Sequence, residues 1–497
     1  MTIGILILLV FLAAAVLMFF RALPALLALP LMAAAIVLIE VAYGKLGPGD
    51  LARAVAADGA VRLADAMVIS MFGGMLSVLM QKAGVAESFV RRGAELAGDN
   101  PWMVGAVMLA IITLLFSTIG GLGAVIMVGT IVLPILASMG VREHISSGIL
   151  LFGISLGGLL NAGNWTVYRT VLGLDDATVF SYALVLFLCV AAVAAVFLTV
   201  ELWRTRLLKP GRKTLLAAAA AVAAAVTAGV LLGRPAAPSA GGGSGELLRW
   251  TVGVLGAALL ASIVADLVRE RGRPARVRWQ AYLIPLVPLV LIVVYDLPFV
   301  AAFICGLLYG ILAVHRRGIV NMTARAVIEG SAGVIPAVVL MIGIGMLLSA
   351  ILGPTRTGPG KYWYDLAAPG GAGAVWPVLA DMQPMLQAIV PESVGAYVLT
   401  FALLGPLALY RGPLNVWGLG YGVGGILLAT GVPAGAVMGI LMSLGTIQGV
   451  CDPTNTANVW VANEVRLDVT TIMWKTLPYA WGAAVLGLIV AGLRFMV

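Results

Sequence analysis

Long apolar runs, most of them near 20 residues, make up most of this chain, and short loops rich in arginine and lysine separate them. About 20 apolar residues is the length of an α-helix that crosses the hydrocarbon core of a bilayer. Lipid cannot hydrogen-bond to exposed backbone, so only helices and closed barrels span a membrane. Only 10% of the 497 residues are charged, whereas a soluble chain carries about 25%. The sequence therefore predicts an all-α polytopic membrane protein.

The apolar runs fall into single spans and paired, shorter ones. Single spans are expected at 3–20, 22–42, 65–83, 178–202, 214–233, 247–268, 281–295, 298–314, 330–352 and 478–496. The paired runs are 102–118 with 122–139 and 385–410 with 414–430, and an interrupted run follows each pair, at 145–172 and 436–460. We predict that each pair is a re-entrant hairpin (102–139 and 385–430), because the tips at 117–121 and 410–415 are polar or rich in glycine. The interrupted runs are predicted to be broken helices.

An internal repeat relates the two hairpins and the two broken helices. At an offset of 291 positions, residues 121–164 align with residues 412–455 without a gap, and 13 of the 44 pairs are identical. Composition alone would give roughly four identities. The alignment places Asn161 on Asp452 and Asn164 on Asn455. A duplicated apolar segment that Gly or Pro interrupts indicates the binding site of a transporter.

The basic loops predict how the chain is oriented. Arginine and lysine concentrate in cytoplasmic loops, which also accounts for the net charge of +8 without a nucleic-acid partner. The basic loops are at 21, 91–92, 204–213, 269–278 and 316–317. All of them face the cytoplasm if each hairpin enters and leaves on one side. Both termini then lie outside, and the two hairpins enter from opposite sides, which is an inverted-topology repeat in the cytoplasmic membrane.

Four parts follow from this map. They are N-terminal scaffold helices (1–64), a first repeat (65–202), linking and scaffold helices with a flexible loop at 234–246 (203–329), and a second repeat (330–497). Segment 44–64 is expected to be an amphipathic piece on the exterior, and 353–380 an exterior loop.

One stretch resembles a known group of transporters. From Gly73 to Arg92 the chain reads Gly-Gly-Met-Leu-Ser-Val-Leu-Met-Gln-Lys-Ala-Gly-Val-Ala-Glu-Ser-Phe-Val-Arg-Arg, a small-residue turn, then Gly-Val-Ala-Glu, then a basic helix end. This resembles the ion transporter superfamily, which includes gluconate permeases, citrate and C4-dicarboxylate carriers, and the large membrane subunits of tripartite ATP-independent transporters. The paired hairpins and broken helices extend the resemblance over most of 65–200 and 330–475.

The resemblance implies an elevator transporter. Its scaffold domain is often dimeric, so we expect a homodimer, and its mobile domain carries two hairpins and two broken helices around an anionic substrate. The chain departs from the dicarboxylate/sodium symporters of this group, because it lacks their Ser-Asn-Thr signature. Asp452-Pro-Thr-Asn-Thr456 occupies the corresponding place, and sodium coupling therefore stays open.

The tips and breaks supply the candidate substrate site. A broken helix leaves N–H groups unpaired at one half-helix and C=O groups unpaired at the other. The N–H end attracts a carboxylate and the C=O end a cation. The candidate substrate-binding residues are Ser117, Thr118, Gly120, Gly121, Asn161, Asn164, Thr166, Arg411, Gly412, Asn415, Thr454, Asn455, Thr456 and Asn458.

Two charged residues among these segments carry the sharpest hypotheses. Arg411 could bind a substrate carboxylate through two parallel hydrogen bonds, or it could extend to lipid headgroups. Asp452 replaces the amide of Asn161, and an acid at membrane depth is costly unless it is protonated or paired. It is the candidate coupling group for H⁺ or Na⁺. The alternative is a structural aspartate that caps the second half-helix.

The leading functional hypothesis is a secondary active transporter of a small organic anion, a carboxylate in particular, in contact with membrane lipid. No GxxxxGK[ST] motif suggests ATP-driven transport, and no cofactor or metal is expected. A membrane enzyme is disfavoured, because the two histidines and the spans offer no nucleophile–base pair or ligand set. A cation antiporter on the same scaffold, and a membrane subunit that needs an extracytoplasmic binding protein, remain alternatives.

Overall fold

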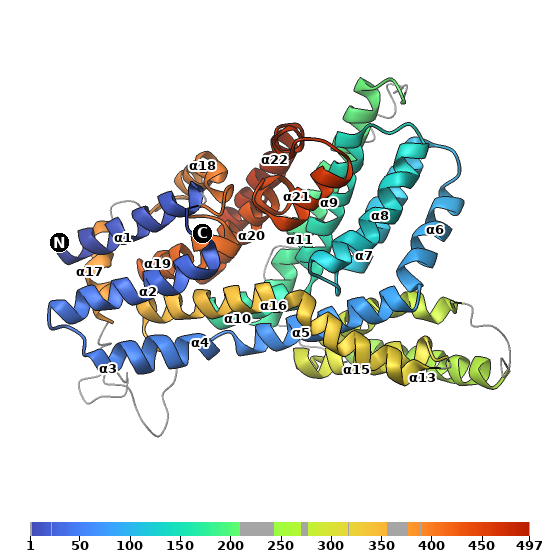
Figure 1. The fold of residues 1–497 in the computed structure, drawn as a ribbon, viewed down its shortest axis with the longest axis horizontal. Helices are drawn as coiled ribbons and strands as arrows, with labels where there is room; N and C mark the ends of the chain where they lie inside the picture. Colours follow the sequence, from blue (N-terminus) through green and yellow to red (C-terminus); the bar gives the residue numbers. More distant parts are fainter. Residues whose placement is uncertain are drawn as a thin grey trace.

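The computed structural model describes residues 2–20, 22–208, 243–269, 277–316, 318–354, 376–386 and 390–496. Every secondary-structure element within these ranges is a helix (Figure 1). The same ranges contain eight segments that are long and apolar enough to cross a membrane. The chain is therefore an all-α, multi-pass membrane protein, as its composition predicted.

The N-terminal half begins with two apolar helices, α1 (Thr2–Phe19) and α2 (Ala25–Ala42). A nearly continuous helical stretch follows, made of α3 (Pro48–Asp50), a π-helical segment (Leu51–Asp58), α4 (Gly59–Val61) and α5 (Ala64–Lys82). Next come α6 (Val85–Ala97), α7 (Pro101–Phe116), α8 (Leu122–Ser138), α9 (Glu143–Leu160), α10 (Ala162–Leu172) and α11 (Asp176–Arg204).

The described part of the C-terminal half also consists of helices that differ widely in length. It contains α13 (Gly243–Arg269), a 3₁₀ turn (Trp279–Leu283), α14 (Leu286–Tyr295), α15 (Phe299–Ala313) and α16 (Ile319–Leu352). After α17 (Pro377–Leu386) come α18 (Val394–Leu403), a 3₁₀ turn (Gly405–Ala408), an irregular turn (Val416–Gly420), α19 (Tyr421–Ala429), α20 (Ala434–Cys451), α21 (Thr456–Glu464) and α22 (Val469–Phe495).

The predicted tips and breaks agree with the observed helix ends. Helices α7 and α8 meet at 117–121, α9 gives way to α10 at Asn161, and α20 ends just before Asp452. The first arm of the second hairpin starts at α18 rather than at 385, because Ser393 caps α18 by accepting a hydrogen bond from the Ala396 N–H. The expected boundary between 329 and 330 falls inside α16, which is one continuous helix.

Several other expectations concern the connecting segments. Segment 44–64 is mostly helical and buries Ala54 and Val55. The expected exterior loop 353–380 includes the start of α17, and α22 begins at Val469, before the expected 478. The span 214–233 and most of the loop 234–246 lie outside the described residues, and residues 243–246 belong to α13.

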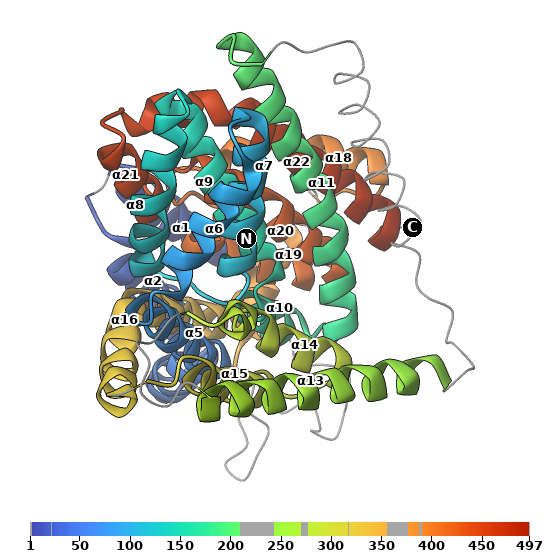
Figure 2. The ribbon, with the colours of Figure 1, turned by 90° about the vertical axis from the view of Figure 1, so that its right-hand side faces the viewer.

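The helices form two groups, which Figures 1 and 2 show from perpendicular directions. In the first group, α16 packs against α2 and α5, and α15 packs against α5. In the second, α20 packs against α22 and α11, and α7 packs against α9. Both hairpin tips and both breaks belong to the second group or face its boundary with α16.

The contact between α5 and α16 depends on two glycines. A Cβ on Gly330 would lie 2.5 Å from the carbonyl oxygen of Gly74 and 2.5 Å from the Cα of Met75. Those are backbone atoms, which cannot rotate aside as a side chain can. Small residues let membrane helices approach this closely.

Replacing Gly330 with alanine is therefore expected to force the two helices apart and lower the free energy of unfolding by roughly 1–3 kcal/mol, the usual cost of overpacking. The matched control is Gly482→Ala in α22, where nothing lies within 4 Å of the added Cβ. Thermal unfolding of the two purified variants checks this. An equal unfolding temperature in both would show that the α5–α16 contact is looser than described.

Candidate functional site

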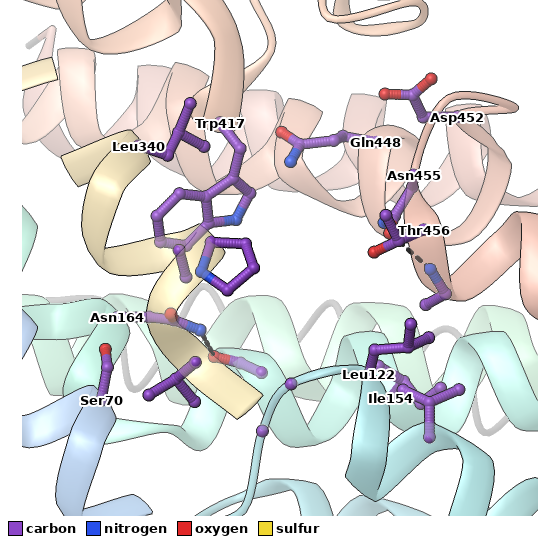
Figure 3. Close-up of a pocket in the computed structure, with 18 of the residues that line it drawn as sticks. Ser70, Leu122, Ile154, Asn164, Leu340, Trp417, Gln448, Asp452, Asn455 and Thr456 are labelled. Carbon is purple, nitrogen blue, oxygen red and sulfur yellow. Dashed lines mark hydrogen bonds between the residues drawn. The ribbon is translucent and has the colours of Figure 1, made fainter. Parts of the chain in front are cut away.

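A cavity of about 820 Å³ lies where the two hairpin tips meet the two helix breaks (Figure 3). Eleven of the fifteen candidate site residues line it: Thr118, Gly120, Gly121, Asn161, Asn164, Arg411, Asn415, Asp452, Thr454, Asn455 and Thr456. Segments that are nearly 300 positions apart in the sequence thus share one wall. Whether these residues contact a substrate stays a prediction.

The first break is held by the side chain of Asn161. Its backbone leaves the helix with φ −79° and ψ 113°. Its Oδ1 accepts a hydrogen bond from the Gly163 N–H at 2.9 Å, and its Nδ2 donates to the carbonyl of Phe116, just before the first tip, at 3.3 Å. Asn164 donates from Nδ2 to the carbonyl of Gly158 at 2.8 Å. The two amides therefore close the end of α9 and tie it to the first hairpin.

The second break has the same backbone shape but a carboxylate in place of the amide. Asp452 leaves α20 with φ −65° and ψ 113°. Its Oδ1 accepts hydrogen bonds from the Thr454 N–H at 2.9 Å, the Thr454 hydroxyl at 2.7 Å and the Tyr410 N–H at 3.0 Å. Its Oδ2 accepts from Asn415 Nδ2 at 2.9 Å. Four donors therefore surround a side chain that is 2% exposed.

The two breaks thus bind their hairpin tips with opposite polarity. Asn161 donates to the first tip, whereas Asp452 accepts from the second. The residue that caps the start of α21 is Asn455, whose Oδ1 accepts from the Ala457 N–H at 3.1 Å. Asp452 therefore does not cap α21. It closes the end of α20 and anchors the second tip, a structural role that is compatible with ion coupling.

Arg411 lies at the second tip with a left-handed backbone, φ 55°, as does Tyr410. Its Nη1 donates to the carbonyl of Trp417 at 3.1 Å. Among the residues that the structure describes, it forms no ion pair, and no other lysine or arginine lines the cavity. A guanidinium carries five N–H groups, so most of its donors are still available at the cavity. It is half-buried in the cavity wall.

Three further donors face the cavity from α20 and α21. Gln448 uses Oε1 to accept from the Val416 N–H at 2.7 Å, and the described residues offer its Nε2 no partner. Asn455 Nδ2 and the Thr456 hydroxyl likewise have no hydrogen-bond partner among the described residues. Figure 3 shows the three side chains on one side of the open space. They could hydrogen-bond to an anionic ligand beside Arg411.

Four candidate residues lie outside the cavity wall. They are Ser117, Thr166, Gly412 and Asn458. The hydroxyls of Ser117 and Thr166 donate to carbonyls of their own helices, those of Leu114 and Ala162. Gly412 is where the second tip packs on itself, because a Cβ there would meet the Leu407 and Leu409 carbonyls. Asn458 Nδ2 donates to the carbonyl of Asp452 at 3.0 Å. These four residues therefore stabilise the helices and the turn that carry the cavity wall, without lining it themselves.

Sequence reasoning missed the rest of the wall. Gln448 could have been found, because it is a polar residue in an apolar run one turn before the break. Helix α16 could not, since the residues that it contributes are all apolar and read as ordinary packing. They are Gly333, Val334, Pro336, Ala337, Leu340 and Met341.

No protein-family model matches this chain, and no curated protein matches it either. The resemblance to the ion transporter superfamily therefore rests on the residues from Gly73 to Arg92 and on the paired hairpins and breaks.

Proposed function

We propose that this chain is a secondary active transporter that moves a small organic anion, a carboxylate, across the cytoplasmic membrane. The observation that carries the proposal is the cavity between two hairpin tips and two helix breaks, with one guanidinium free of ion pairs in its wall. Ligand sites in membrane transporters form where discontinuous helices from two repeats meet. A free guanidinium at such a point attracts a carboxylate.

The proposed mechanism is an elevator. The helices that carry the tips and breaks, α7–α11 and α18–α22, would move as one body past the group that contains α2, α5, α15 and α16. In this proposal α5 belongs to the static group, because it packs against α16 and α15. The two repeats would have inverted topology, with both termini outside, and the static group would hold a homodimer together.

Coupling to H⁺ or Na⁺ is assigned to Asp452. Its two oxygens already accept four hydrogen bonds, so a coupling ion has to displace at least one donor. In this proposal the displaced donor is Tyr410 or Asn415, which are parts of the second tip. Binding of the ion would then loosen the second tip, and this would link ion binding directly to movement of the second hairpin.

The test is uptake into proteoliposomes that contain only the purified protein. Candidate carboxylates are first chosen by thermal shift, since a ligand that binds the folded state stabilises it by about 2.7 kcal/mol at a hundred times its Kd. Concentrative uptake that needs an inward H⁺ or Na⁺ gradient supports the proposal. Flux of Na⁺ against H⁺ with no organic anion active would favour the antiporter instead.

A further inference from the structure

We infer that the cavity takes an amphipathic monocarboxylate, that is, one carboxylate on a branched or aromatic hydrocarbon body. Polyhydroxylated acids and di- or tricarboxylates fit it poorly. The inference rests on the proposed function and names the substrate class of the same site. It comes from the distribution of charge, donors and apolar surface around the cavity.

The charges in the wall match one carboxylate. Arg411 is the single cation among the described residues that line the cavity. The only acidic side chain there, Asp452, is surrounded by donors of its own and would repel a second substrate carboxylate. Burying a charge without a partner is costly. A substrate with two or three carboxylates would therefore leave at least one of them without a cation.

Three free side-chain donors lie together on the side of α20 and α21. They belong to Gln448, Asn455 and Thr456, as described above, and they suit the oxygens of one carboxylate beside Arg411. Most other polar side chains of the wall are already hydrogen-bonded inside the protein; the exceptions among the described residues are Thr118 Oγ1 and Asn415 Oδ1, which have no partner. Ser70 donates to the Ala66 carbonyl, and the Asn161 and Asn415 amides hold the two tips. The hydroxyls of a sugar acid would find few partners, and unpaired buried polar groups are strongly disfavoured.

The opposite wall is hydrocarbon. Helix α16 contributes Pro336, Leu340 and Met341, the α1–α2 turn adds Leu23, and α2 adds Leu26. Figure 3 shows the Trp417 indole beside Leu340, across the open space from Asn455 and Thr456. A site with convergent polar groups at one end and apolar side chains at the other recognises an amphipathic molecule. The volume of about 820 Å³ is in the upper part of the roughly 300–1,000 Å³ typical of sites for drug-sized ligands.

The experiment compares matched ligands by calorimetry on the full chain in lipid nanodiscs, without detergent that could fill the cavity. The probes are 3-phenylpropanoate and 4-methylpentanoate, against propanoate, succinate, citrate and gluconate. We expect the two amphipathic acids to bind at least tenfold more tightly than any of the other four, since each buried methylene contributes roughly 10-fold or more in a fitted pocket. The amide of 3-phenylpropanoate should bind far more weakly than the acid.

A pair of variants on α16 tests where the hydrocarbon body lies. Leu340→Ser is expected to weaken 3-phenylpropanoate about tenfold or more and propanoate less than twofold. Val339→Ser is the matched control, because Val339 is 40% exposed and does not line the cavity. If Leu340→Ser fails to fold, Leu340→Ala, a milder truncation, takes its place with the same expected direction.

The outcomes separate this inference from the proposed function. Tighter binding of citrate, succinate or gluconate would overturn the inference and leave the carboxylate transporter standing. Equal effects of Leu340→Ser on both acids would also overturn it. If no carboxylate binds the folded protein, the proposed function fails and the inference fails with it.

Discussion

Replacing Asp452 with asparagine is expected to abolish accumulation driven by an ion gradient while substrate exchange continues. The amide cannot exchange a proton or attract Na⁺ as a carboxylate does. Its Oδ1 can still accept from Tyr410 and Thr454, but its new NH₂ group faces Asn415 Nδ2, a second donor. We therefore also expect a lower free energy of unfolding, by roughly 1–3 kcal/mol for the lost charge-assisted bond. Counterflow and gradient-driven uptake in proteoliposomes separate the two activities.

The control for this prediction is Thr454→Val. It removes the hydroxyl that donates to Asp452 at 2.7 Å but keeps the carboxylate. If Asp452 acts only as a structural anchor, the two variants should lose activity in proportion to their lost stability. Asp452→Asn that still concentrates substrate on a gradient would remove Asp452 from the coupling step.

Replacing Arg411 with lysine is expected to weaken substrate binding by roughly 10- to 100-fold, although the charge is kept. A guanidinium can bind a carboxylate through two parallel hydrogen bonds. An ammonium group acts as a point charge and cannot form this bidentate pair. A hydrogen bond to a charged group contributes about 1.5–3 kcal/mol, which sets the size of the effect. The affinity of the best carboxylate ligand, measured by calorimetry, gives the result.

Arg466→Lys is the matched control, because Arg466 also has a left-handed backbone, with φ 57°, but is exposed and does not line the cavity. It should bind substrate like the unmodified protein. Unchanged affinity in Arg411→Lys as well would move Arg411 from the substrate site to the lipid interface.

The sequence predicted the tips and breaks well because they are polar interruptions in apolar runs. Membrane helices tolerate such interruptions only where other protein groups or a cavity satisfy the exposed backbone. The pattern therefore placed Asn161 and Asp452 at helix ends, where the structure has them. It could not show that Asp452 would be surrounded by four donors, because two of these come from Tyr410 and Asn415, about 40 positions away.

The apolar wall was beyond prediction for a different reason. Leu340 and Met341 have the same composition as the lipid-facing and packing residues around them, so only the fold distinguishes a leucine beside a cavity from one beside lipid. Likewise, the sequence placed the start of the second repeat at 330, but this position lies within the continuous helix α16, which begins at Ile319.

In the proposed elevator movement, the contrast between the two walls affects how easily one group of helices slides past the other. Helix α16 offers only apolar residues to the cavity, and the free side-chain donors described above belong to the second tip, to α20 and to the second break with the start of α21. A bound anion would keep its hydrogen bonds throughout the movement, since none of them joins it to α16. The contacts that α16 makes with the moving helices at the cavity would be dispersion contacts, which are individually weak and non-directional. The substrate would then move together with its hydrogen-bond donors, and the surface of α16 that they pass would stay apolar throughout the movement.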